Sequence, residues 1–337
     1  MTYYGQFDSM VDAVLSPARR REPNEPLVCV DLFCGIGGFH IAATNLGLKV
    51  VFASDIDDCA CKTYYHNFGL YPEGDIVAIP AGDIPDHDLL FAGFPCQPFS
   101  IIGSKRGTAD SRGTLFLEII RIARVKRPLG IVIENVKQLA TAQHGAVLTQ
   151  ILDGLQALGY TTDWRILNAL DFGLPQKRER VIIVGTLTKF DSFPWPNEKI
   201  PMLPLSDILE QNPDNKYFVS ERIRAKRKTL HKPKQTPSIW HENKGGHISS
   251  YPFSCALRAG ASYNYLLVDG ERRLTPRELL RLQGFPDNFE IVCNDSQTRK
   301  QAGNAVPVPL VQAAIKGVVD VIKRLLSSGK FTCKGLK

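Results

Sequence analysis

One cysteine of the chain follows a predicted strand, in a position where it could act as a nucleophile. Residues 93–100 read Gly-Phe-Pro-Cys-Gln-Pro-Phe-Ser and come directly after the apolar run 88–92. In open α/β sheets, ligands bind beyond the carboxyl ends of the strands, where Cys96 would lie. A free thiol is only a few per cent ionised near neutral pH, so Cys96 would need activation or a receptive electrophile. The alternative is that Cys96 is a small buried residue at a turn.

A carboxylate and two guanidinium groups stand beside two further apolar runs. Glu134 follows the run 131–133, and Arg178 and Arg180 precede the run 181–184. In one sheet these groups could converge with Cys96 on a single edge. A thiolate, a carboxyl group that donates a proton and a fixed positive charge together suit attack on an electron-poor ring.

A glycine turn near the start of the chain indicates a nucleotide site. Residues 35–38 read Gly-Ile-Gly-Gly and lie between an apolar run and a helical pattern. Glycines let the backbone approach a ligand, and the helix N-terminus offers free amide donors. Asp55 lies 20 residues beyond Gly35, at the end of the next strand, which suits a ribose diol. The turn departs from Gly-x-Gly-x-x-Gly because residue 40 is His40. It leaves NAD, S-adenosyl-L-methionine and a ligand-free turn open.

The elements that must position these groups alternate along the first half of the chain. Short apolar runs alternate with helical patterns up to about residue 185, which predicts an α/β domain with a mostly parallel central sheet. Residues 186–275 are rich in Pro, Asn, Lys, Ser and Tyr, which favours a smaller, irregular domain of strands and loops. Helical patterns return at Pro276 and over residues 309–326.

Length and composition exclude several classes of protein. The 337 residues are 44% hydrophobic and 22% charged, which rules out a disordered chain, a collagen and a coiled coil. We find no apolar stretch of roughly 18 residues and no signal-peptide pattern at the start, so we expect a cytoplasmic protein. The eight cysteines include no Cys-x-x-Cys pair, so no metal site is expected.

The positive net charge of +7 is concentrated in one run. Residues 222–234 hold seven basic side chains and no carboxylate: Arg222, Arg224, Lys226, Arg227, Lys228, Lys232 and Lys234. The run predicts either a solvated loop or a contact with a polyanion such as the backbone of a nucleic acid.

Six motifs in one order resemble those of the prokaryotic DNA (cytosine-5)-methyltransferases of restriction–modification systems. They are residues 31–39, 95–97, 134–136, 176–180, 273–286 and 303–306. The resemblance implies a Rossmann-like, S-adenosyl-L-methionine-dependent methyltransferase fold with a smaller, irregular, β-rich target-recognition domain. It also implies four parts: an N-terminal extension over residues 1–26, a catalytic part over 27–187, the recognition domain over 188–275, and a segment over 276–337 that returns to the catalytic domain.

The resemblance implies a covalent mechanism. Cys96 would add to carbon 6 of a cytosine that has been flipped out of the duplex, and carbon 5 would then take the methyl group. Glu134 would engage ring N3 and the exocyclic amine as negative charge develops. Arg180 would hold the base oxygen, and Arg178 would support the active site.

The resemblance also assigns a cofactor site for S-adenosyl-L-methionine. Phe33 would pack on the adenine, and Asp55 would bind the ribose hydroxyls. The remaining contacts would come from Gly35, Ile36, Gly38, Ile56, Asp75, Ile76, Pro95, Asn304 and Val306. No metal is implied.

The DNA contacts that the resemblance implies lie in two segments. Ser100 would contact a backbone phosphate, and Gln97, Lys105, Arg106 and Arg112 lie in the same segment. Arg258 is a candidate for reading guanine or for a phosphate contact. It follows Ala256-Leu257, which stands where the family usually has a Thr-Leu pair.

Double-stranded DNA is therefore the expected partner of a monomeric enzyme, with a cognate endonuclease acting separately. A transfer-RNA cytosine-5 methyltransferase is the main alternative, because that family shares the motifs. A repressor without catalysis and a dehydrogenase are the others. Neither of these explains Cys96, Glu134 and the two arginines together.

Overall fold

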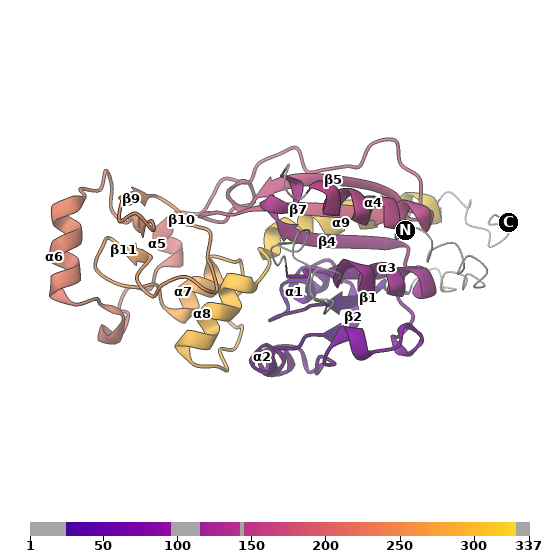
Figure 1. The fold of residues 1–337 in the computed structure, drawn as a ribbon, viewed down its shortest axis with the longest axis horizontal. Helices are drawn as coiled ribbons and strands as arrows, with labels where there is room; N and C mark the ends of the chain where they lie inside the picture. Colours follow the sequence, from indigo (N-terminus) through magenta and orange to yellow (C-terminus); the bar gives the residue numbers. More distant parts are fainter. Residues whose placement is uncertain (1–24, 96–114, 142–144, 328–337) are drawn as a thin grey trace, which may run out of the picture.

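The computed structural model describes residues 25–95, 115–141 and 145–327. Figure 1 shows two parts side by side: a large sheet covered by helices, and a smaller part with its own short strands. The predicted fold class, α/β with a smaller β-containing part, is confirmed.

The large sheet has six strands, and five of them run in the same direction. Strands β2, β1, β3 and β4 pair in parallel, whereas β7 is antiparallel to both of its neighbours. The prediction of a mostly parallel sheet is therefore confirmed. In spatial order the strands are β2 (Lys49–Ser54), β1 (Val28–Leu32), β3 (Leu89–Ala92), β4 (Gly130–Val136), β7 (Glu179–Thr186) and β5 (Thr161–Asn168).

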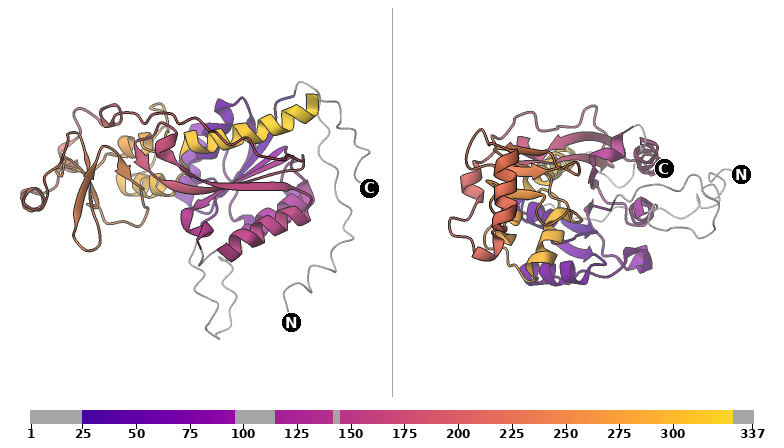
Figure 2. Two further views of the ribbon diagram at one scale, coloured as in Figure 1. Left: turned by 90° about the horizontal axis from the view of Figure 1, so that it is seen from above. Right: turned by 60° about the vertical axis from the view of Figure 1, so that its left-hand side comes forward.

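Alternating side chains of the strands build a core on each face of the sheet. Leu89 and Phe91 of β3 pack into one cluster, and Leu90 and Ala92 pack into the other, because successive strand side chains point to opposite faces. Helices α1 (Gly38–Asn45) and α9 (Val308–Ser327) cover the first face, and α3 (Leu115–Lys126) and α4 (Gly145–Ala157) cover the second (Figure 2). The chain therefore returns to its first domain at the C-terminal helix.

Helix α9 corrects one expectation. The stretch Asp295–Arg324 contains an 18-residue window of mean hydropathy 1.6, although we predicted that no apolar stretch would reach that length. Of this window, 72% is buried. Its apolar composition reflects packing against the sheet, where Ala314, Ile315 and Val318 are fully buried.

The smaller part combines a three-stranded sheet with helices. Strand β8 pairs antiparallel with β11 and with β9, and β10 pairs with β6 of the large part. The elements of the smaller part are α5 (Leu205–Ile208), α6 (Glu221–Leu230), β8 (Ile239–Glu242), β9 (Ile248–Tyr251), β10 (Ser254–Cys255) and β11 (Leu266–Val268). Strand β6 (Gln176–Lys177) comes just before β7.

The basic run forms a helix, where we predicted a loop. Most of it lies in α6, at the far end of the smaller part (Figure 1). Arg, Lys, Ala and Leu are good helix formers, and the cations Arg227 and Lys228 in the last turn suit the helix dipole. The buried Arg227 pairs with Glu242 of β8 and fastens the helix to the sheet.

Two helices lie between the smaller part and the large sheet: α7 (Pro276–Arg281) and α8 (Asp295–Asn304) (Figure 1). Helix α7 begins at the predicted Pro276, with Thr275 and Glu278 forming a capping box. Helix α8 is joined to the start of α2 (Asp58–Phe68) by an ion pair of 2.6 Å between Lys300 and Asp57. The C-terminal segment thus contacts both parts before α9 rejoins the sheet.

Candidate active site

A cavity of about 660 Å³ opens at the carboxyl ends of β1, β2, β3 and β4. Each strand contributes residues at or just beyond its end: Phe33 after β1, Asp55 after β2, Gly93 after β3 and Glu134 in β4. Helix α8 closes another wall with Lys300, Gln301 and Asn304. The edge of the sheet that we predicted for ligand binding therefore carries the cavity.

The glycine turn, near the start of the described chain, lies against a residue near its end. Gly35 and Gly37 have φ angles of +54° and +85°, which favour glycine. A Cβ atom on Gly38 would lie 2.6 Å from Cγ2 of Val306, so a larger residue would displace that valine. Gly38 and Val306, which were predicted separately as cofactor residues, are thus in contact beside the cavity.

The carboxylate of Asp55 is fixed by backbone amides. It accepts hydrogen bonds from the N–H of Gly35 at 2.8 Å and from the N–H of Asp57 at 2.9 Å. Burial raises the pKa of the Asp55 carboxyl above its ordinary value of 3.8, and the two amides act in the opposite direction. The next residue, Ile56, lines the cavity with 76% of its surface exposed. A fixed acceptor beside exposed apolar surface suits a ligand with both hydroxyl groups and a flat apolar ring.

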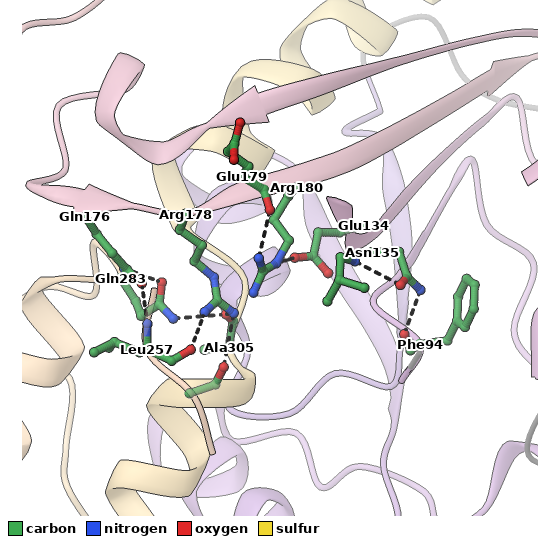
Figure 3. Close-up of polar contacts among 12 residues, drawn as sticks. Phe94, Glu134, Asn135, Gln176, Arg178, Glu179, Arg180, Leu257, Gln283 and Ala305 are labelled. Carbon is green, nitrogen blue, oxygen red and sulfur yellow. Dashed lines mark hydrogen bonds and ion pairs between the residues drawn. The ribbon is translucent and has the colours of Figure 1, made fainter. Parts of the chain in front are cut away.

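Glu134 and Arg180 form an ion pair in the wall of the cavity (Figure 3). They lie on the paired strands β4 and β7, and Nε of Arg180 is 2.7 Å from Oε1 of Glu134. Both side chains are nearly buried, with 12% of Arg180 and 10% of Glu134 exposed. The neighbouring Asn135 donates to the carbonyl of Phe94 at 3.0 Å, which ties β4 to the segment that leads to Pro95. We predicted that Glu134 and the two arginines converge with Cys96. Glu134, Arg178 and Arg180 line the cavity together with Pro95, and Cys96 lies outside the described residues.

Arg178 lines the cavity but binds backbone carbonyls (Figure 3). Its buried guanidinium donates to the carbonyl oxygens of Leu257 at 2.9 Å, Gly303 at 3.1 Å and Ala305 at 2.8 Å. Burial, and next the charge of Arg180, lower the pKa of Arg178 to about 9. The guanidinium therefore joins the smaller part and the C-terminal segment to the catalytic sheet.

Two glutamines that we did not single out complete this junction (Figure 3). Gln176 accepts from the N–H of Leu257 at 3.0 Å and donates to the carbonyl of Leu282 and to Gln283. Gln283 in turn donates to the carbonyl of Ala305. Both backbone groups of Leu257 are thus bound by side chains of the segment that carries Arg180. Gln176 and Gln283 stand inside two of the six motifs, and this was the signal in the sequence that could have found them.

The other predicted residues fall into three groups. Most of the predicted cofactor residues line the cavity: Phe33, Gly35, Ile36, Asp55, Ile56, Asp75, Ile76, Pro95 and Asn304. Arg258 lies outside it, at a neighbouring hollow. Six predicted residues lie outside the described part of the chain: Cys96, Gln97, Ser100, Lys105, Arg106 and Arg112. Within the described part, no cluster of three His, Cys, Asp or Glu side chains could hold a metal ion.

The fold and the cavity are those of a Rossmann-like α/β enzyme whose candidate ligand site lies beyond the carboxyl ends of the strands. The model of one family, described as C-5 cytosine-specific DNA methylase, matches residues 27–320. The chain therefore belongs to the C-5 cytosine-specific DNA methylase family.

Relatives of known type support this assignment. The chain is 51% identical over 290 residues to the Type II methyltransferase M.NgoBI of Neisseria gonorrhoeae, covering 85% of this chain and 91% of the relative. It is also 51% identical over 295 residues to M.HaeII of Haemophilus aegyptius, covering 86% and 92%. The prediction of a DNA cytosine-5 methyltransferase is confirmed, in preference to a transfer-RNA enzyme.

Solved structures show the same fold. The crystal structure of S. pombe Dnmt2 methyltransferase aligns with a TM-score of 0.67 at 22% identity, covering 88% of this chain and 99% of that one. A putative DNA modification methyltransferase from an E. coli prophage aligns with a TM-score of 0.68 at 22% identity, covering 88% and 99%.

Proposed function

We propose that the chain methylates carbon 5 of one cytosine within a short site of duplex DNA, through a covalent bond between Cys96 and carbon 6. The observation that carries this proposal is the Glu134–Arg180 ion pair in the wall of the cavity. Cys96 is bonded to Pro95, which lines the same cavity. A nucleophile, a carboxylate and a guanidinium that converge on one cavity are what addition to a cytosine ring requires.

The residues of the cavity fit S-adenosyl-L-methionine. The fixed carboxylate of Asp55 suits the ribose hydroxyls, and the exposed side chain of Ile56 offers apolar surface to the adenine. Phe33, Asp75 and Ile76 would complete the adenine site, and Gly35, Ile36 and Asn304 would hold the methionine portion. When bound, this cofactor supplies an electrophilic methyl group.

The side chains of the chain then act on the cytosine. The Cys96 thiolate bonds to carbon 6, and the electron pair of the carbon 5–carbon 6 double bond moves into the ring, which makes carbon 5 nucleophilic. With a proton on one of its oxygens, the Glu134 carboxyl donates to ring N3 as negative charge builds there, and its other oxygen accepts from the exocyclic amine. Arg180 donates to the carbonyl oxygen on carbon 2 and stabilises the same charge. After carbon 5 has been methylated, loss of its proton to a base expels the Cys96 thiolate and restores the ring.

The Glu134–Arg180 contact has its own part in this mechanism. The ion pair holds both groups in one orientation before a base arrives, and such preorganisation avoids a rearrangement during the reaction. A nearly buried ion pair contributes little net stability but strongly disfavours the loss of either partner. Orientation is therefore its main effect.

The relatives are named Type II methyltransferases, which supports a role in protecting DNA from an endonuclease that acts separately. We infer that the enzyme works as a monomer, because one chain carries both a catalytic cavity and a candidate DNA-contacting segment around Arg258. We also infer that it works in the cytoplasm.

The test combines a methyl-transfer assay with a covalent trap. Wild-type protein and Cys96→Ala would be incubated with methyl-labelled S-adenosyl-L-methionine and genomic DNA, and the DNA then bisulfite-sequenced. We expect wild-type protein to label one short motif and Cys96→Ala to lose transfer by about 10³-fold or more while still binding DNA. DNA that contains 5-fluorocytosine, whose fluorine cannot leave as a proton does, should be captured covalently by wild-type protein only. Full activity in Cys96→Ala would overturn the mechanism.

A further inference from the structure

A second hollow, of about 250 Å³, lies across α8 from the catalytic cavity. Asp295 and Arg299 of α8 line this hollow, whereas Lys300, Gln301 and Asn304 of the same helix line the catalytic cavity. Its other walls come from the smaller part and from the start of α7. We call it the arginine–tyrosine hollow, after Arg258, Arg273 and Arg299 and after Tyr217, Tyr263 and Tyr265.

The lining of this hollow has four cations and one carboxylate, Asp295, so positive charge is in excess. Lys216, the fourth cation in the lining, pairs with Asp295 at 3.0 Å. Arg258, Arg273 and Arg299 form no ion pair with a carboxylate in the part of the chain that the structure describes. Three guanidinium groups with uncompensated charge around one hollow attract an anion.

Tyrosine rings and backbone carbonyls hold these arginines in place instead. Tyr263 has the guanidinium carbon of Arg299 at 4.3 Å and that of Arg273 at 5.2 Å from its ring centre. Arg258 lies 4.8 Å from the centre of the Tyr265 ring. Arg299 also donates to the carbonyl of Ala261 at 2.8 Å. Contacts of this kind orient the guanidinium groups and leave their charge available, so less ordering is needed when a ligand binds.

The hollow is coupled to the catalytic cavity by the backbone that runs between them. Leu257, immediately before Arg258, has its N–H bound by Gln176 and its carbonyl bound by Arg178. The residue after Arg258, Ala259, packs against Gly303 of the cavity wall, where a Cβ atom would lie 2.4 Å from the Ala259 nitrogen. A duplex that delivers a base to the cavity therefore brings its backbone next to the hollow.

We propose that the arginine–tyrosine hollow binds a backbone phosphate of the DNA close to the target cytosine. This inference rests on the proposed function. Guanidinium groups match the geometry of phosphate oxygens, and phosphate contacts fix the position of a protein on a duplex without reading its sequence. Arg273 and Arg299 already donate to backbone carbonyls inside a hollow, which suits a fixed phosphate site better than a side chain that extends to a base edge.

The experiment measures DNA binding by Arg299→Ala over a range of salt concentrations. Two duplexes would be used: one with the motif mapped by bisulfite sequencing, and one with that motif scrambled. We expect Kd to rise by roughly 3- to 30-fold, and by the same factor for both duplexes. The slope of log K against log salt should fall in magnitude by about 0.9, the value for a single phosphate contact.

Two further variants make the result decisive. Arg299→Lys keeps the charge and should keep the salt slope, which separates loss of charge from damage to the fold. Arg165→Ala removes an exposed arginine that lies 5.4 Å from the Trp195 ring on edge strand β5, and it should change neither Kd nor slope.

Three outcomes would overturn the proposal. An unchanged Kd and salt slope in Arg299→Ala would exclude a DNA contact at the hollow. A weakening confined to the duplex with the motif would identify Arg299 as a base reader. A slope that falls equally in Arg299→Lys would show that the substitutions damage the fold and do not act through charge. Failure of the wild-type protein to methylate DNA would instead count against the proposed function.

Discussion

The catalytic cavity and the arginine–tyrosine hollow lie on two sides of helix α8, and the cations that line them have different partners. In the cavity, Arg180 is paired with Glu134 and Lys300 with Asp57, and the buried Arg178 donates to backbone carbonyls. In the hollow, Lys216 is paired with Asp295, whereas Arg258 and Arg299 lie against tyrosine rings and form no ion pair within the described residues. A neutral base and a cofactor with a positive sulfonium do not require a positive wall, whereas a DNA backbone does. The chain thus leaves positive charge unbalanced where a polyanion would bind.

The largest effect on activity should come from a change in the Glu134–Arg180 ion pair of the catalytic cavity. Glu134→Gln keeps the shape of the side chain but removes its charge, and we expect the methylation rate to fall by about 10²- to 10³-fold. Initial rates at saturating DNA and cofactor would measure it. Glu179→Gln is the matched control, because Glu179 forms a surface pair with Lys137 and should change the rate by less than about twofold. A Glu134→Gln enzyme with near wild-type rate would make the ion pair a purely structural contact.

A smaller effect is expected at the cofactor end of the cavity. Asp55→Asn should weaken binding of S-adenosyl-L-methionine by about tenfold, because a charged acceptor is replaced by a neutral one. Burial raises the pKa of Asp55, so its charged form is complete only above that raised value. Wild-type affinity should therefore fall as the pH drops through the raised pKa of Asp55.

Calorimetric titrations from neutral pH down to about pH 4.5 would check this prediction, because the ordinary pKa of an aspartate lies just below that range. The affinity of Asp55→Asn should vary less with pH than that of the wild type. The exposed neighbour Asp58, which does not line the cavity, provides Asp58→Asn as a control. Equal pH profiles in wild type and Asp55→Asn would remove Asp55 from the cofactor site.

The smallest effect should come from α6, which lies at the end of the smaller part that is remote from the large sheet (Figure 1). Arg222 and Lys226 are exposed, so bulk salt screens them. We expect the double change of both to Ala to raise Kd for DNA by less than about threefold and to lower the salt slope by at most about 1 for each phosphate that is no longer neutralised. Fluorescence anisotropy with labelled duplexes would measure both. A greater weakening than in Arg299→Ala would make α6 the main phosphate site and break the comparison.

The catalytic half was predictable because its signals are local. The runs that we named at residues 88–92, 131–133 and 181–184 follow directly from the sequence, and the structure places them in β3, β4 and β7. The cavity was predictable because the ends of parallel strands meet at one edge of a sheet. Periodicity within a strand or helix is enough for these assignments.

The junction and the second hollow depend on contacts between distant parts of the chain. Gln176 donates to Gln283, which lies 107 residues further along the chain. No local pattern indicates that either side chain joins two parts of the molecule. Tyr263 and Arg299 become neighbours because α8 packs on the smaller part. Helix α6 was missed because its basic residues show no apolar periodicity, and because Arg227, which attaches it to the smaller part, contacts Glu242 and Asn264, which are distant in the sequence.

The two hydrogen bonds that hold the backbone of Leu257 have a consequence for how the specificity of such enzymes can change. Gln176 and Arg178 bind its peptide N–H and carbonyl, groups that every residue except proline carries in full. The three atoms that a Cβ atom on Gly303 would meet first belong to the backbone of Arg258 and Ala259. These contacts therefore hold the backbone of residues 257–259 without using the side chains of Arg258 and Ala259, whereas the side chain of Leu257 is buried in the core. Recombination could exchange the DNA-reading segment between relatives and alter specificity, while the chemistry of the catalytic sheet is inherited unchanged.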